Sequence, residues 1–155
     1  MSELWLVTGS QHLYGPQTLA AVQAHGQEVA GGLGDGLPLP VRHRGPVTTA
    51  EEIRRACLEA TADDDCAGVI VWAHTFSPAK AWIGGLEALR KPVLHLHTQF
   101  GRELPWADID MDFMNLNQSA HGDRELAHAM TRLGVVRKTV AGHWRDPVVA
   151  ARVET

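Results

Sequence analysis

The chain has 155 residues, of which 45% are hydrophobic and 21% charged, and its formal net charge is −4. This composition fits one globular domain and excludes a disordered chain, and its scattered basic residues argue against nucleic acid or an anionic membrane as the main partner. No apolar run approaches the roughly 20 residues of a spanning helix, and no basic, cleavable leader precedes the first apolar run. We therefore expect a cytoplasmic protein. Its two cysteines, Cys57 and Cys66, lack metal-ligand spacing and are predicted to be reduced and buried.

The chain begins with a predicted buried strand and a polar loop. Residues 4–8 form a short apolar run, which is typical of a strand covered on both faces. The run stops at Gly9 and is followed by Ser-Gln-His-Leu-Tyr over residues 10–14. Because open α/β sheets bind ligands at the carboxyl ends of their strands, this loop is a candidate binding site. Pro16 then suits the first turn of a helix over residues 17–33.

A second strand and helix follow. Residues 37–42 are predicted to form a strand, and the prolines at positions 38 and 40 place it at an edge of the sheet, where a missing N–H is tolerated. Thr49 and Glu52 form a capping box that opens a helix ending near residue 62. The residues expected on the buried face of that helix are Ile53, Cys57 and Leu58.

The remainder of the chain continues the alternation of strands and helices. We expect strands over 66–72, 92–97 and 137–141, helices over about 78–89 and 119–133, and a long irregular segment with one helical turn over 98–117. Ser77 is predicted to cap the first of these helices, with Pro78 as its first residue. Asp146 and Pro147 open a last helix that has only about two turns before residue 155. Such a short helix indicates the front part of a longer polypeptide, and a frayed terminal helix is the alternative.

Five strand–helix units in order predict an α/β fold. We expect a flavodoxin-like (Rossmann-like) three-layer αβα sandwich whose five-stranded parallel sheet has the order 2-1-3-4-5, with right-handed crossovers. This order places the proline-marked strand at an edge and the switch point between strands one and three. The loops over residues 9–15 and 73–77 should therefore lie side by side.

The residues of these loops favour a sugar over a nucleotide. The chain has no GxGxxG or Walker pattern, and the first loop holds side chains too bulky for a pyrophosphate to approach the backbone. Uncharged polar groups can hydrogen-bond sugar hydroxyls, and aromatic rings can cover the apolar face of a sugar. The candidates are Gln11, Tyr14, His74 and Phe76. The alternative is that these residues only cap and pack ordinary loops.

Other residue patterns do not define a site by themselves. His95 and His97 alternate on the fourth strand and should face the same side, but no carboxylate is fixed nearby by spacing, so packing is favoured over a metal pair. Alternating carboxylates that lack calcium-loop spacing are predicted to be turn and cap residues: Asp108, Asp110 and Asp112. Trp106 and Trp144 are expected to be exposed at a contact surface.

Several longer motifs resemble those of L-arabinose isomerase. They lie at residues 9–15 (Gly-Ser-Gln-His-Leu-Tyr-Gly), 71–80, 97–100, 110–122 and 142–144, in order along the whole chain. The resemblance implies conversion of L-arabinose to L-ribulose, and often of D-galactose to D-tagatose, through an enediol. It also implies a carboxylate base and a divalent metal, usually Mn²⁺. The family's metal ligands lie in central and C-terminal domains that have no counterpart here.

The resemblance therefore implies a single N-terminal domain over residues 1–155, without catalytic residues, without specific Mn²⁺ binding and inactive by itself. In the family this domain packs in homo-oligomers and covers the active site of a neighbouring subunit. The implied sugar-binding residues are Gln11, Leu13, Tyr14, Phe76, Gln118 and His121. One alternative is a stand-alone sugar-binding or assembly module, and another is a minimal isomerase that uses the His and Asp groups of this domain.

Overall fold

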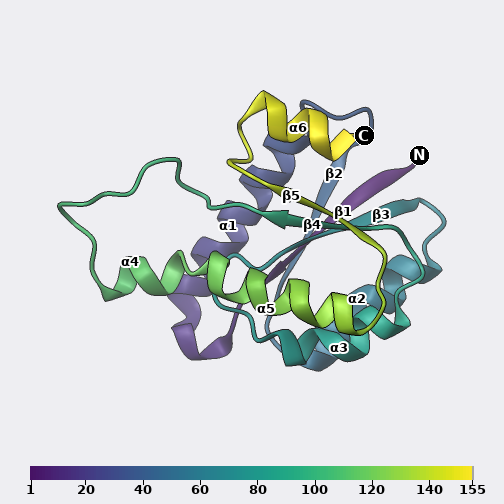
Figure 1. The fold of residues 1–155 in the computed structure, drawn as a ribbon, viewed down its shortest axis with the longest axis horizontal. Helices are drawn as coiled ribbons and strands as arrows, with labels where there is room; N and C mark the ends of the chain where they lie inside the picture. The colour runs from purple at the N-terminus through teal and green to yellow at the C-terminus, as the bar shows by residue number, and fades with distance from the viewer. Residues whose placement is uncertain (155) are drawn as a thin grey trace.

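A parallel sheet with helices on both faces forms the core of the chain (Figure 1), as predicted. The computed structural model describes residues 1–154. Its strands, in the spatial order β2-β1-β3-β4-β5, are β1 (Glu3–Gly9), β2 (Val41–Val47), β3 (Cys66–Trp72), β4 (Val93–His97) and β5 (Arg137–Ala141). The helices are α1 (Gly15–Gly34), α2 (Ala50–Ala62), α3 (Ala79–Ala88), α4 (Met111–Leu116), α5 (Ser119–Arg132) and α6 (Pro147–Glu154), with a 3-10 turn η1 at His12–Tyr14.

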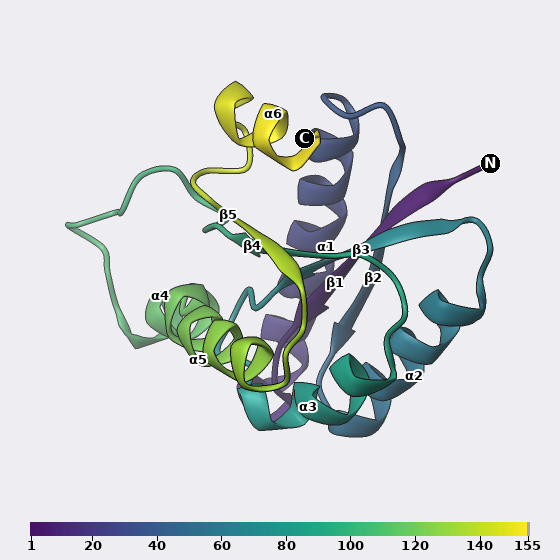
Figure 2. The same ribbon diagram turned by 45° about the vertical axis from the view of Figure 1, so that its right-hand side comes forward.

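Each face of the sheet has its own apolar cluster. Helices α1 and α6 cover one face and α2, α3 and α5 the other, and both views show this separation (Figures 1 and 2). Because successive side chains of a strand point to opposite faces, Trp5 and Val7 join the cluster under α2, α3 and α5, whereas Leu6 joins the other. The central strand β1 is thus buried on both sides, as its continuous apolar run predicts.

The second strand begins later than the sequence predicts. It runs over Val41–Val47 instead of residues 37–42, and its pairing with β1 starts at Leu4 and Val41. Pro38 and Pro40, the prolines that marked the predicted strand, both precede it. The carbonyl of Pro40 accepts the first hydrogen bond between the two strands, from the Leu4 N–H at 2.8 Å. The predicted edge position is confirmed.

Helix ends follow their local sequence signals with one exception. The capping box of α2 is present, with the Glu52 N–H donating to Thr49 Oγ1 at 3.1 Å, and Asp110 caps α4 through the Phe113 N–H at 2.8 Å. Ser77, however, does not cap α3, and Pro78 is not its first residue, because α3 begins at Ala79 with Pro78 at the N-cap position. The Ser77 hydroxyl oxygen instead accepts a hydrogen bond from Trp82 Nε1 at 3.0 Å. The last helix is described as far as Glu154, so the part of that prediction at residue 155 lies outside the described residues.

Two apolar residues are placed differently from the prediction. Leu58 is 41% exposed because it lies one residue, about 100°, around α2 from the buried Cys57. Trp144 is only 2% exposed, since it packs over Gly32 of α1, where any side chain would meet its ring, whereas Trp106 is exposed as predicted. None of the helices within residues 1–154 combines the length and the apolar character needed to cross a bilayer.

Candidate functional site

The first and third loops are joined at the carboxyl end of the sheet. The Thr75 hydroxyl donates to Ser10 Oγ at 2.8 Å in a buried contact, and Gln11 Nε2 donates to the Phe76 carbonyl at 2.8 Å. The expectation that these loops lie side by side is therefore confirmed. Their contact follows from the strand order, because β1 and β3 are neighbours and both run to the same edge.

Four of the predicted site residues form one cluster on this edge. Gln11 Nε2 also lies 3.3 Å from the hydroxyl of Tyr14, and the rings of Phe76 and His121 are 5.2 Å apart at 59°. Gln11, Tyr14 and Phe76 are half-buried, and His121 is exposed. Leu13 is 73% exposed on the same loop. The cluster therefore presents an amide, a phenol, an imidazole and an apolar ring from three different elements.

Gln118 and His121 also line a cavity of about 650 Å³ beside this cluster. The cavity lies between the start of α5 and the segment over 98–117, which includes α4 and projects from the sheet in Figures 1 and 2. Its apolar wall is formed by Leu104, Trp106, Ile109, Phe113 and Met114. Such a volume is within the range of about 300–1,000 Å³ that is typical of small-molecule sites. His121 is shared by the cluster and the cavity, which makes the two adjacent.

His74 does not line the cluster, so the prediction from loop chemistry is wrong for this residue. Its side chain is 1% exposed, its Nε2 lies 2.8 Å from His25 Nδ1, and its ring stacks on Trp72 at a centroid distance of 4.2 Å. Burial lowers the pKa of His74 to about 3, so the imidazole is neutral at physiological pH. The residue packs the base of the third loop.

Asp123, which the sequence pattern did not identify, is the partner of His95. His95 Nε2 lies 2.8 Å from Asp123 Oδ1, both side chains are buried, and His97 Nε2 is 3.9 Å from the other carboxylate oxygen. Burial raises the pKa of the Asp123 carboxyl against the opposing effect of His95. The two histidines do face the same side, with their rings 6.1 Å apart at 13°.

The side chains that the structure describes do not fit a manganese site. Within residues 1–154, no group of three or more His, Cys, Asp or Glu side chains is arranged to hold a metal ion. The direct contact between His95 and Asp123 leaves no space for an ion between those two groups.

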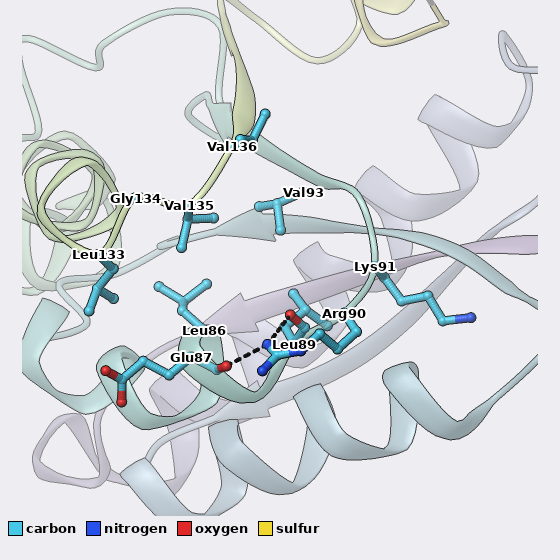
Figure 3. Close-up of a pocket in the computed structure, with 10 residues that line it drawn as sticks. All are labelled: Leu86, Glu87, Leu89, Arg90, Lys91, Val93, Leu133, Gly134, Val135 and Val136. Carbon is cyan, nitrogen blue, oxygen red and sulfur yellow. Dashed lines mark hydrogen bonds between the residues drawn. The ribbon is translucent and has the colours of Figure 1, made fainter.

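A second cavity, of about 470 Å³, lies at the opposite edge of the sheet (Figure 3). It is formed where α3 ends and where β4 and β5 begin, and it contains none of the predicted sugar-binding residues. Arg90 caps the end of α3, because its Nη1 donates to the carbonyls of Glu87 and Leu89 at 2.6 and 3.1 Å (Figure 3), and Lys91 Nζ donates to the Asp63 carbonyl at 2.9 Å. The residues predicted to bind a sugar therefore lie away from this cavity.

Comparison with known proteins identifies close relatives. A family model described as "L-arabinose isomerase N-terminal domain" matches residues 1–155. The chain is 60% identical over 153 residues to an L-arabinose isomerase of Geobacillus stearothermophilus, covering 97% of this chain and 31% of the relative. It is also 60% identical to one of Nocardioides sp. (97% and 30%) and 55% identical to one of Koribacter versatilis (99% and 31%). The chain thus spans about one third of the length of these curated relatives.

Proposed function

Because the chain belongs to the L-arabinose isomerase N-terminal domain family, we propose that it is the sugar-covering domain of an L-arabinose isomerase. The enzyme would convert L-arabinose to L-ribulose, and D-galactose to D-tagatose, through an enediol. The observation that carries this proposal is the convergence of Gln11, Tyr14, Phe76 and His121 on one edge of the sheet. These residues come from three separate elements, and their types suit hydroxyl groups and the apolar face of a sugar.

Each residue has a distinct role in the proposal. The Gln11 amide nitrogen is held by the Phe76 carbonyl, which leaves its amide oxygen to accept a sugar hydroxyl. The Phe76 ring and the exposed Leu13 side chain enclose the apolar parts of the sugar. Gln118 and His121 hydrogen-bond further hydroxyls from the start of α5. Together they bind and orient the sugar and keep water from the enediol.

Proton transfer between C1 and C2 belongs to other parts of the enzyme in this proposal. The side chains described here do not fit a metal, and we assign neither a metal-dependent step nor the base to this chain. The chain is expected to be inactive alone. In a homo-oligomer it is expected to cover the active site of a neighbouring subunit. The unpaired, buried Cys57 and Cys66 support a reducing, cytoplasmic location.

A chimaeric enzyme tests the proposal. This chain replaces the matching 153 residues of the Geobacillus stearothermophilus relative, and conversion of L-arabinose is measured with Mn²⁺. The chimaera should be active and the 155-residue chain alone inactive. His121→Ala should raise KM by about 3- to 10-fold through the loss of one hydrogen bond. His128→Ala, at an exposed position farther along α5, is the matched control.

Turnover by the isolated chain would contradict the assignment of catalysis to other domains. If the chimaera is active and its His121→Ala and His128→Ala variants have equal KM values, the proposed hydrogen bond from His121 to the sugar is refuted. An inactive chimaera, combined with L-arabinose binding by the isolated chain in calorimetry, would instead favour a stand-alone sugar-binding module.

A further inference from the structure

Gln99 carries a side-chain amide that is free to bind a ligand, since it pairs with no group of residues 1–154. It directly follows β4, it is half-buried, and it lines the 650 Å³ cavity together with Gln118 and His121. Within residues 1–154 its amide makes no hydrogen bond, in contrast to Gln11, whose nitrogen donates to the Phe76 carbonyl. The atoms of this amide are not among the buried unpartnered ones, so they remain accessible, and water or a ligand can complete their hydrogen bonds.

Gln99 and Gln118 are held next to each other by a buried hydrogen bond between their chain neighbours. The Ser119 hydroxyl donates to the Thr98 carbonyl at 2.9 Å, across 21 residues of sequence. The same carbonyl accepts a hydrogen bond from Trp72 Nε1 at 3.0 Å, which ties it to β3. Thr98 and Ser119 are 3% and 1% exposed, so this link is protected from water. The backbone positions from which Gln99 and Gln118 extend are therefore fixed by buried hydrogen bonds.

An uncovered apolar wall also lines this cavity. Trp106 is 81% exposed and Met114 44% exposed, and both line the cavity with Phe113. A sugar has hydroxyl groups on its edge and an apolar face of C–H groups, and it needs both kinds of surface in one site. The amides and the indole supply these surfaces within a single cavity.

We propose that Gln99 is a sugar-binding residue, whose amide hydrogen-bonds hydroxyls of a sugar or polyol held between Gln118 and the Trp106 wall. One amide both donates and accepts, so Gln99 and Gln118 together can bind neighbouring hydroxyl groups. The inference rests on the proposed function for the nature of the ligand. The inference goes further in one respect: the isolated chain binds a sugar or polyol in this cavity when the other domains of the enzyme are absent.

The test is a titration of the 155-residue chain with ribitol, an unreactive polyol, followed by the NMR signals of the glutamine side-chain amides. The Gln99 and Gln118 signals should shift saturably with one common Kd. Gln99→Leu should raise this Kd by about 3- to 10-fold, the effect of one neutral hydrogen bond. Gln27→Leu, at an exposed position on α1, should leave it unchanged. The backbone spectrum of each variant shows whether it remains folded.

The outcomes separate this inference from the proposed function. A saturable shift at Gln118 without one at Gln99, or equal Kd values for Gln99→Leu and Gln27→Leu, overturns the role of Gln99 while the sugar-covering function stands. No saturable shift at either amide overturns the cavity as a site of this chain. The activity of the chimaera decides the proposed function separately, because it does not depend on the affinity of the isolated chain.

Discussion

The buried His74 should make the fold sensitive to mild acid. Burial lowers the pKa of this imidazole from 6.5 to about 3, whereas in the unfolded chain it titrates near pH 6.5. As the pH falls below about 6.5, the His74 imidazole becomes protonated in the unfolded state but stays neutral in the folded state. The free energy of unfolding therefore decreases by about 1.4 kcal/mol per pH unit. At about pH 5.0 the loss due to His74 alone is therefore about 2 kcal/mol.

His74→Gln isolates this contribution. The amide retains a group that can hydrogen-bond to His25 Nδ1 but cannot be protonated in this range. The free energy of unfolding is measured by urea denaturation with circular dichroism at about pH 7.5 and 5.0. The parent should lose about 2 kcal/mol more than the variant between these values. Burial also lowers the pKa values of His25 and His43, but these residues are present in both proteins. Equal losses in parent and variant would refute the reasoning.

Three further substitutions test other parts of the structure by urea denaturation. Thr49→Ala removes the α2 cap and should cost about 1 kcal/mol; an unchanged midpoint would show that the cap is dispensable. Gly85→Ala should lower the free energy of unfolding by about 1–3 kcal/mol, because the added Cβ would lie 2.9 Å from Ile53 Cγ2 and 3.0 Å from Cys57 Sγ. An unchanged free energy of unfolding would mean that α2 and α3 can move apart to accept the methyl group. Trp106→Ala should change stability by less than about 0.5 kcal/mol, since the side chain is 81% exposed, yet it should weaken ribitol binding. A large loss of stability would indicate that the indole is part of the core.

The candidate site was only partly visible in the sequence. Gln11, Tyr14 and Phe76 were found because they follow apolar runs, and strand ends predict where ligands bind in parallel sheets. His74 follows such a run as well, but it points into the aromatic packing between Trp72 and His25. Local sequence does not distinguish a loop side chain that faces solvent from one that faces the core. Gln118 came only from the family resemblance, because it lies at the start of a helix far along the chain from the first loop. His121 could be placed near the carboxyl edge of the sheet from the sequence, but its sugar-binding role came from the resemblance.

The amino-acid sequence by itself determined the alternation of strands and helices, the edge position of the proline-marked strand and the capped start of α2. These features depend on periodicity, missing N–H groups and side chains within a few residues, all of which are local. The tertiary structure alone decided which distant groups meet. His95 contacts Asp123 across 28 residues, and Thr98 holds Ser119 across 21. Such contacts arise from the packing of α5 against the sheet, which brings two glutamines and an indole into one cavity although no spacing along the chain records it.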